Sequence, residues 1–409
     1  MKSKFSPLLV AVAVLAASGA SSADRGAALR ALSERLGVGP GGVVADVGCG
    51  RGHDSFVFAG VVGETGVVLA EEISADQLKA VLEGSRERKL GQVVPVLGDA
   101  SDPHLPNGRV DLIYLHFVFH HLSDPRSMLR SMWLDLRPGG HLAIVDRARG
   151  PLRDPVPLEK REREHHWTGE TAVVRLAREA GFEFADAPDD LWPEKEAFLV
   201  IFRRPSGPAE PGRDPDAPGA LGPEALDALP LLGEVEGDAA VFALDAGRAL
   251  LPGLRERLGP SRRAFDVVLE EWVVAEGDVP ERGGEGFEIL RAEGGSVALP
   301  DGTKLAAAIF ADAYHRFWDP AALLGRLRGA LVPGGRVAIL DRPGPEGEPR
   351  RLAGHRRRIS PGLVREELAR AGFALAGERA DVAGRFLLVF EAGEPPKAPS
   401  EPASLERQF

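Results

Sequence analysis

Three glycines at alternate positions follow a short apolar run near the start of the chain. They lie in Asp46-Val47-Gly48-Cys49-Gly50-Arg51-Gly52, which overlaps the end of the run 43–47. Glycine lets the backbone come close to a ligand, because it has no side chain and readily adopts positive φ. A turn of this kind after a strand is typical of sites that hold a nucleotide-like group. A tight connection between a strand and a helix is the simpler alternative.

Two carboxylates are spaced as such a site requires. Glu72 follows the apolar run 67–70, about 20 residues past the last glycine, where nucleotide-binding sheets place an acid for ribose hydroxyls. Asp99, within Gly98-Asp99-Ala100, follows the apolar run 93–97, and a carboxylate there can accept a hydrogen bond from an adenine amino group. The glycine turn and the two acids are therefore expected to converge on one crevice.

Short aliphatic runs alternate with amphipathic stretches around these residues. The periodicity predicts helices over 75–88 and 126–136, and strands over 43–47, 67–70, 93–97, 112–117 and 142–145. This alternation predicts an α/β fold with a mostly parallel, doubly wound sheet flanked by helices on both faces. Ligands of such sheets bind at the carboxyl ends of the strands, near the point where the strand order reverses.

The combined motifs resemble the class I S-adenosylmethionine-dependent methyltransferases of the small-molecule type, over about residues 25–205. The matching segments are the turn 46–52, Glu72-Ile73-Ser74, Gly98-Asp99-Ala100, and the Pro-Gly-Gly turn in Leu136-Arg137-Pro138-Gly139-Gly140. A nicotinamide dehydrogenase is the competing interpretation of a glycine turn. It predicts neither the Pro-Gly-Gly turn nor the segment 120–125.

The resemblance implies S-adenosylmethionine as cofactor and assigns roles to residues. Asp46 would help hold the methionine end, and Glu72 with Ile73 would lie at the ribose. The remaining cofactor-binding residues would be Gly48, Cys49, Gly50 and Gly52 in the turn, Asp99 and Ala100 at adenine, and His116 near the sulfonium. The reaction would be an in-line displacement in which the protein chiefly aligns donor and acceptor.

Two adjacent histidines, His120 and His121, follow the strand 112–117 at the mouth of the expected site. Imidazole titrates near the pH at which a general base works, so either could accept a proton from the methyl acceptor. Capping and packing are the alternative roles. His165-His166-Trp167 lies where such folds build an acceptor pocket or lid. We expect no metal site, and we expect Cys49 to be a small residue that fits its turn.

The second half of the chain repeats the first in outline. Four matched segments occur in the same order, at 105–108, 119–125, 136–147 and 180–182 in the first half and at 299–302, 314–320, 331–342 and 371–373 in the second. A series of this kind predicts an internal duplication, and hence two Rossmann-like methyltransferase domains. The sequence leaves open whether the two copies pack together within the chain.

The second copy lacks the glycine turn. Its equivalent of the first strand is expected within 241–250, where Gly247 is the one glycine and Arg248 and Leu250 would crowd the cofactor. Glu271 would correspond to Glu72, and Ala292-Glu293 to the adenine motif. We therefore expect a degenerate methyltransferase domain that does not bind the cofactor.

A basic cluster stands out in the second copy, at 350–351 and 355–358. It is interpreted as a solvated helix face or, alternatively, as a contact for an anionic acceptor or partner. The chain as a whole has 61 acidic and 50 basic residues, a net charge of −11. This balance argues against a general nucleic-acid binder.

The predicted organisation has five parts. They are a signal peptide at 1–23, a methyltransferase domain at 24–205, a Pro/Gly-rich linker at 206–223, the degenerate domain at 224–393 and a disordered tail at 394–409. The leader implies export to the periplasm, with no transmembrane span after cleavage. A membrane-anchored protein that faces the cytoplasm is the alternative.

The sequence thus predicts a methyltransferase that uses S-adenosylmethionine on a small-molecule or lipid-like acceptor. The alternative is an exported, non-catalytic protein that uses the fold to bind the cofactor or to interact with a partner. The complete set of cofactor motifs in the first copy favours the enzyme.

Overall fold

The computed structural model describes residues 22–147, 169–194, 197–229, 235–269, 285–293, 296–317 and 319–392. The predicted lid residues 165–167, Glu271, the leader up to residue 21 and the tail 394–409 lie outside the described residues. Within the described residues, no helix is both long and apolar enough to cross a membrane.

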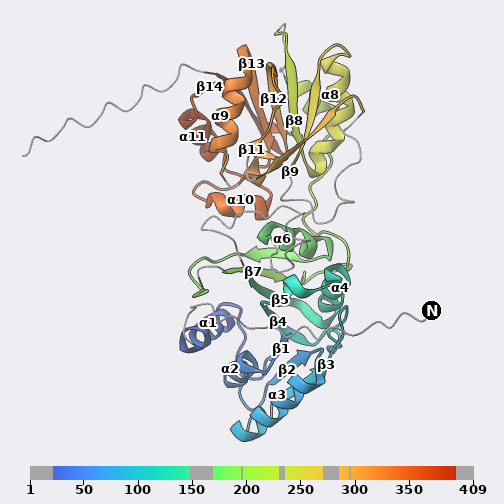
Figure 1. The fold of residues 1–409 in the computed structure, drawn as a ribbon, viewed down its shortest axis with the longest axis vertical. Coiled ribbons are helices and arrows are strands. Elements are labelled where there is room, and N and C mark those ends of the chain that lie inside the picture. Colours follow the sequence, from blue (N-terminus) through green and yellow to red (C-terminus); the bar gives the residue numbers. More distant parts are fainter. Residues whose placement is uncertain are drawn as a thin grey trace, which may run out of the picture.

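The first half is built around a seven-stranded sheet with the order β3-β2-β1-β4-β5-β7-β6 (Figure 1). Strands β1 to β5 are parallel, and β7 runs antiparallel to β5 and β6. The strands are β1 (Val43–Val47), β2 (Val67–Glu72), β3 (Val93–Leu97), β4 (Val110–His116), β5 (Leu136–Arg147), β6 (Glu183–Asp186) and β7 (Ala197–Arg203). The strand order reverses between β1 and β4, which places a ligand crevice at their carboxyl ends.

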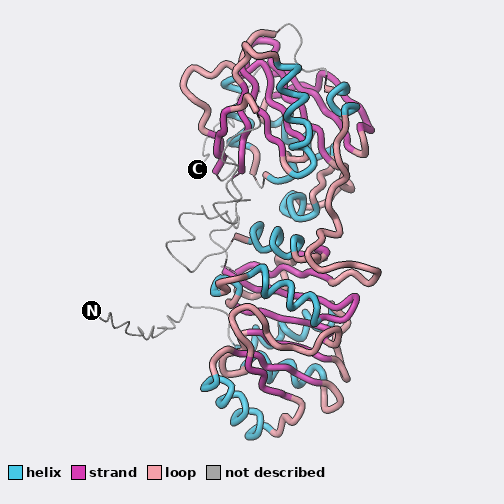
Figure 2. Tube along the Cα trace, turned by 90° about the vertical axis from the view of Figure 1, so that its right-hand side faces the viewer, coloured by secondary structure: helices cyan, strands magenta, loops and turns pink. Residues whose placement is uncertain are grey.

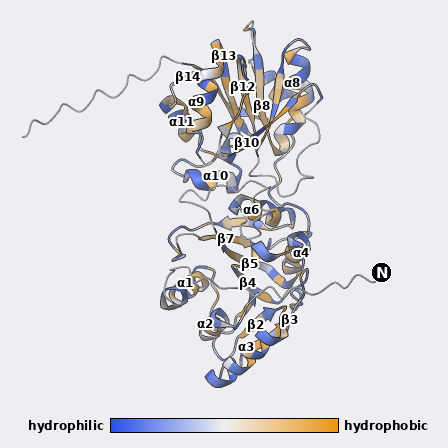
Figure 3. Ribbon diagram, in the orientation of Figure 1, coloured by the Kyte–Doolittle hydropathy of each residue, from blue (hydrophilic) through white to orange (hydrophobic). Residues whose placement is uncertain are grey.

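Helices cover both faces of this sheet. They are α1 (Ser22–Arg35), α2 (His53–Val62), α3 (Ala75–Arg88), α4 (Pro125–Asp135) and α6 (Glu170–Glu179), with the short 3₁₀ helix η1 (Phe119–His121) after β4. Apolar residues of α1, α2 and α3 pack on one face, and those of α4 and α6 pack on the other. Apolar colouring accordingly concentrates on the strands (Figure 3). The predicted doubly wound fold is confirmed.

The second half has an eight-stranded sheet with the order β11-β10-β9-β8-β12-β13-β15-β14. Its strands are β8 (Asp238–Ala243), β9 (Ala264–Leu269), β10 (Glu288–Glu293), β11 (Ser296–Val297), β12 (Leu305–Ala311), β13 (Leu331–Asp341), β14 (Phe373–Val382) and β15 (Arg385–Ala392). Its helices are α7 (Pro223–Ala228), α8 (Leu251–Leu258), α9 (Ala321–Ala330), α10 (Arg350–Arg356) and α11 (Pro361–Arg370), with 3₁₀ helices η2 (Asp245–Leu250) and η5 (Tyr314–Arg316). Apart from the short β11, the strand order is that of the first half, so the prediction of two Rossmann-like domains is confirmed.

The two halves also share side-chain detail at the junction of their fourth and fifth strands. In the first half, His120 Nδ1 lies 2.7 Å from Asp146 Oδ1, and the His120 backbone N–H donates to Asp146 Oδ2 at 3.0 Å. In the second half, His315 and Asp341 repeat both hydrogen bonds at 2.6 and 2.9 Å. A buried carboxylate thus ties η1 to β5 and η5 to β13 in the same way.

The two halves are joined end to end, with α6 of the first facing α10 of the second (Figures 1 and 2). The predicted linker has neither helix nor strand over 206–222, and α7 begins at Pro223. It is nevertheless held by side chains of both halves. Arg178 donates to Asp216 at 2.7 Å, and Arg385 donates to the carbonyl of Gly219 at 2.8 Å.

The basic cluster lies at this junction. His355 is fully buried and its Nε2 lies 2.9 Å from Glu170 Oε1, while Arg357 is paired with Asp214. The interpretation as a solvated helix face is therefore wrong for these two residues, because acidic residues of the first half and the linker cover them. The anionic partner of the cluster is part of the same chain.

Candidate functional site

The glycine turn after β1 requires glycine at each alternate position. Gly48, Gly50 and Gly52 have φ values of 68°, 55° and 78°, a backbone region that other residues rarely adopt. A Cβ at Gly48 would lie 2.5 Å from the Val118 side chain. A Cβ at Gly50 would meet no described atom within 4 Å. The turn therefore presents open backbone on its outer side at Gly50.

Two adjacent glutamates at the end of β2 fix this turn. Glu71 Oε2 accepts the backbone N–H of Gly48 at 3.0 Å, and Glu72 Oε2 accepts that of Gly50 at 3.1 Å. Burial, which outweighs the hydrogen bond from Gly48, raises the pKa of Glu71 to about 7. Sequence reasoning selected Glu72 and missed Glu71, although the adjacent acid was visible, because only the strand register shows which side chain reaches the turn.

Gly98 is required by the same arrangement. A Cβ there would lie 2.0 Å from Glu71 Oε1, a buried oxygen that has no hydrogen-bond partner among the described residues. The glycine of the predicted adenine motif thus makes room for the Glu71 carboxyl. Ile73 and Leu97, at the ends of β2 and β3, are 64% and 55% exposed. The carboxyl ends of β2 and β3 thus carry two exposed apolar side chains beside Glu72 and Asp99.

Asp46 lies at the base of the crevice, on β1, and is 3% exposed. Its Oδ2 accepts the hydroxyl of Ser55 at 2.5 Å. Burial, followed by the nearby charge of Asp54, raises its pKa to about 7. A cationic group in the crevice would stabilise the ionised form, so the carboxyl is poised to respond to a positively charged ligand.

Asp99 is exposed and is held by its own loop. Its Oδ1 accepts the backbone N–H groups of Ser101 and Asp102 at 2.8 and 2.9 Å, and these bonds, that of Ser101 first, lower its pKa. Its Oδ2 lies 3.3 Å from His104 Nε2. The adjacent Ala100 is exposed too. Their predicted contact with adenine stays a prediction, and a ligand there would meet His104.

His116, at the end of β4, is the centre of a cluster that sequence reasoning missed. Its Nδ1 lies 3.3 Å from Asp54 Oδ2, and its Nε2 lies 3.5 Å from Glu194 Oε2. Burial opposes a charge here, yet the hydrogen bonds to Asp54 and Glu194 raise the pKa of His116. The ring lies among those of Tyr114, Phe117 and Trp192. His116 is therefore favoured as a charged donor rather than as a base.

His120 and His121 lie side by side, with ring centroids 4.0 Å apart. The His120 side chain is 3% exposed and is bonded to Asp146, whereas His121 is exposed. The same bonds recur at His315 in the half without the glycine turn, which favours a structural role for His120. Their role as bases stays a prediction, for which His121 is the more accessible.

Cys49 is half-buried within the turn. Burial and then the charge of Asp46 raise the pKa of its thiol far above the usual range, so the nucleophilic thiolate is disfavoured. This agrees with a small residue that fits the turn. Among the described residues, no group of three or more His, Cys, Asp or Glu side chains could hold a metal ion.

The described residues at the corresponding end of the second sheet are arranged differently. The strand register places Val241 where the first half has Asp46, and η2 replaces the glycine turn. A Cβ at Gly247 would lie 2.0 Å from the carbonyl oxygen of Ala311, so η2 packs directly on the end of β12. Arg248 Nη2 then pairs with the buried Asp266 of β9 at 2.9 Å.

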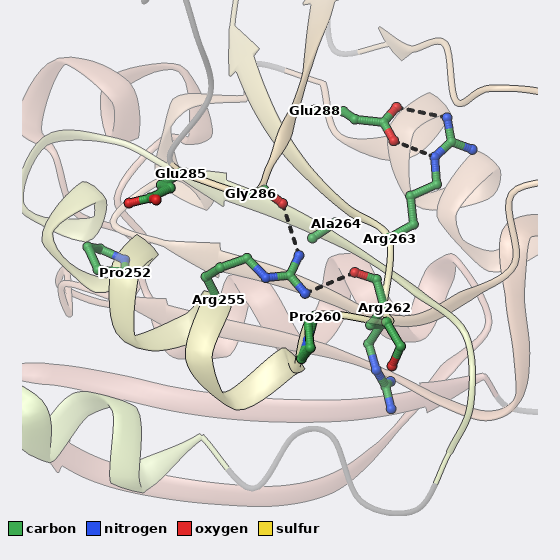
Figure 4. Close-up of a pocket in the computed structure, with 10 residues that line it drawn as sticks. Pro252, Arg255, Pro260, Arg262, Arg263, Ala264, Glu285, Gly286 and Glu288 are labelled. Atoms are coloured by element: carbon green, nitrogen blue, oxygen red, sulfur yellow. Dashed lines mark hydrogen bonds and ion pairs between the residues drawn. The ribbon is translucent and has the colours of Figure 1, made fainter.

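A surface hollow in the second half lies at the amino-terminal ends of its strands, where β9 and β10 begin (Figure 4). Two of its three arginines have partners within the hollow, and the third, Arg262, donates to the carbonyl of Val235 at 2.9 Å. Arg263 pairs with Glu288 at 2.7 Å, and Arg255 donates to the carbonyls of Gly286 and Arg262 at 3.0 and 2.9 Å. The hollow is remote from the carboxyl ends of the strands, and each arginine among its described lining residues already has a hydrogen-bond partner.

Comparison with known proteins relates part of the first half to a family. Residues 45–144 match the family described as methyltransferase domain. A ubiquinone/menaquinone biosynthesis C-methyltransferase from Vibrio vulnificus is 31% identical over 121 residues, which are 29% of this chain and 46% of that protein. Phosphoethanolamine N-methyltransferase 1 from Arabidopsis thaliana is 26% identical over 176 residues, which are 42% of this chain and 34% of that protein.

A solved structure of a SAM-dependent methyltransferase from Aquifex aeolicus is 25% identical to this chain, with a TM-score of 0.37. The match covers 43% of this chain and 88% of that protein. The chain spans less than half the length of the curated relatives named above. Residues 45–144, which carry the glycine turn, β2 and the adenine motif, are a methyltransferase domain. The resemblance to class I methyltransferases is thereby confirmed for the first half.

Proposed function

We propose that this protein transfers a methyl group from S-adenosylmethionine to a small-molecule or lipid-like acceptor, at the crevice of its first half. The proposal includes export through the leader 1–23. It also treats the second half as a duplicated methyltransferase-like domain without a cofactor site. The observation that carries it is the turn 48–52, whose three glycines have positive φ and whose amides are bonded to two glutamates.

The described residues fit the cofactor. Open backbone at Gly50, the acids Asp46 and Glu72, and the apolar surfaces of Ile73 and Leu97 lie along the ends of β1, β2 and β3. When bound, the cofactor supplies an activated methyl group on a sulfonium. The chain would bind and orient the cofactor. The Asp46 carboxylate would lie at its cationic end, and Ile73 and Leu97 would make apolar contacts with its adenine.

The acceptor class is proposed from the names of the relatives. One is named for ubiquinone and menaquinone biosynthesis and another for phosphoethanolamine, so both act on small or lipid-related molecules. The net charge of −11 is a further argument against nucleic acid as acceptor.

The Glu72→Gln variant tests the cofactor site. The change keeps the shape of the side chain but removes the charge that bonds the turn, and a hydrogen bond to a charged group contributes about 1.5–3 kcal/mol. We expect affinity for S-adenosylmethionine, measured by calorimetry, to fall about tenfold to a hundredfold. Glu83→Gln, on the exposed face of α3, is the control and should bind normally.

Transfer itself is tested with a methyl-labelled donor and a pool of small molecules and lipids. Label should enter the extractable pool with wild-type protein and much less with Glu72→Gln. Normal binding in Glu72→Gln would refute the site. Binding by the wild type without any transfer would instead favour the non-catalytic alternative.

A further inference from the structure

The second half contacts a loop of the first half that leads to the candidate site. Arg351, on α10, places its Nε 2.5 Å from Asp189 Oδ2, and its guanidinium also donates to the carbonyl of Ala187. Both partners belong to the connection between β6 and β7, which the structure describes over 187–194. Arg351 thus bonds the loop through a side chain and through its backbone.

Other residues of α10 pack against the first half, so the backbone that carries Arg351 is held in place. Leu352 is 5% exposed and belongs to the hydrophobic core of the first half. His355 is bonded to Glu170, and its carbonyl accepts Arg178 Nη2 at 2.5 Å. Buried apolar and polar contacts therefore hold α10 in one position relative to α6.

The far end of the same loop lies against His116. Trp192 is 7% exposed, and its ring centroid is 5.3 Å from that of His116. Its indole N–H donates to Glu194 Oε2 at 3.1 Å, and the same oxygen lies 3.5 Å from His116 Nε2. Two of the groups that surround His116 are thus supplied by a loop whose other end is bonded to Arg351.

We propose that the second half is a built-in positioning partner for the site, with Arg351 holding the loop 187–194 so that Trp192 and Glu194 stay against His116. Arg351 is a positioning residue, because it touches neither the crevice nor His116. The consequence for methyl transfer rests on the proposed function. The positioning itself does not, and can be measured without cofactor or acceptor.

The ionisation of His116 reports the position of Glu194. The charged or titratable groups around it are Asp54 on α2, Glu194 on the loop, Asp46 on β1 and Tyr114 on its own strand. Arg25 on α1 reaches Asp54 at 3.0 Å. The hydrogen bond from Glu194 helps to raise the pKa of His116, so displacement of Glu194 should lower that pKa.

The experiment is an NMR titration of His116 in the full chain, with its signal assigned from a His116→Gln variant. Glu194→Gln should lower the pKa of His116. Arg351→Ala should lower it in the same direction and by a large part of that shift, and Arg351→Lys should restore part of the loss. Arg365→Ala removes an exposed ion pair with Glu378 elsewhere in the second half and should leave the titration unchanged.

Asp189→Asn breaks the same ion pair from the first half. It should lower the pKa of His116 in the same direction as Arg351→Ala but by less, because the bond from Arg351 to the Ala187 carbonyl remains, and it keeps the test valid if Arg351→Ala folds poorly. An unchanged His116 titration in both variants, beside a lowered pKa in Glu194→Gln, would overturn the proposal. No change in Glu194→Gln would overturn it as well, because the loop would then not act on His116. Neither result would bear on cofactor binding.

Discussion

Replacing Gly50 by leucine should reduce the affinity for S-adenosylmethionine by at least about a hundredfold, close to 3 kcal/mol in binding free energy. Gly50 has φ 55°, and a Cβ on it would point into space that no described atom fills within 4 Å. A leucine side chain would occupy that space, where the proposed site holds the cofactor. The change would also disturb the amide that donates to Glu72. Calorimetric titration of the full chain measures the effect.

The matched control is Gly63→Leu. Gly63 follows α2, has φ 65°, and likewise has no described atom within 4 Å of an added Cβ. Its ψ of −173° puts Gly63 in a backbone region that is essentially restricted to glycine, so Gly63→Leu costs at least as much backbone strain as Gly50→Leu, and its added Cβ likewise meets no described atom. Of the two substituted glycines, Gly50 lies in the turn after β1 and Gly63 does not. Equal loss of binding in both variants would attribute the effect to strain and would count against the site.

Replacing Glu170 by alanine should loosen the junction between the two halves by about 1–3 kcal/mol, the cost of leaving a buried polar partner unsatisfied. The side chains of Glu170 and His355 are each 1% exposed, so water does not readily replace the lost contact. We expect amide hydrogen exchange in α10 to accelerate by about five- to 150-fold, which is the same free energy expressed as an opening equilibrium.

Glu179→Ala is the control for this change. Glu179 is on the same helix, but it is 37% exposed and pairs with Arg126 and Arg175 at the surface. Such pairs contribute little to stability, so exchange in α10 should stay close to that of the wild type. Unchanged α10 exchange in Glu170→Ala would show that the buried contact does not hold the halves together.

Much of the first half could be predicted from its sequence. The bounds of β1, β3 and α3 agree with the expected ranges, because each is a continuous aliphatic or amphipathic run flanked by residues that end it. Ser74, for example, accepts the Gln77 amide and caps α3. The glycine turn was equally visible, because positive φ restricts the residue type at every second position.

The surroundings of His116 could not be predicted in this way. Asp54 and Glu194 are 140 positions apart in sequence, and neither belongs to a recognisable motif. They meet because α2 and the β6–β7 loop both pack at the end of β4, which is a property of the tertiary fold. The contact of Arg351 with Asp189 is beyond sequence reasoning for the same reason, since it joins the two halves.

The second half shows that sequence motifs can be shared between the two halves while the residues at the crevice differ. Its Pro-Gly-Gly segment, which lies within β13, and its buried His315–Asp341 pair match the first half, because both maintain the packing of a parallel sheet. Residues at the crevice differ between the two halves. There η2 with Arg248 replaces the glycine turn, and Asp312 pairs with Arg385 just after β12. The comparison therefore separates residues that maintain the fold from residues proposed to hold the cofactor.

The central claim is one cofactor site per chain, located in the first half. The most direct measurement is the stoichiometry of S-adenosylmethionine binding to the full chain by isothermal titration calorimetry. We predict one equivalent for the wild type and no detectable binding for Gly50→Leu at the same concentrations. A second equivalent that persists in Gly50→Leu would contradict the proposal that the second half has no cofactor site. No binding to the folded wild-type chain would contradict the proposed cofactor site itself.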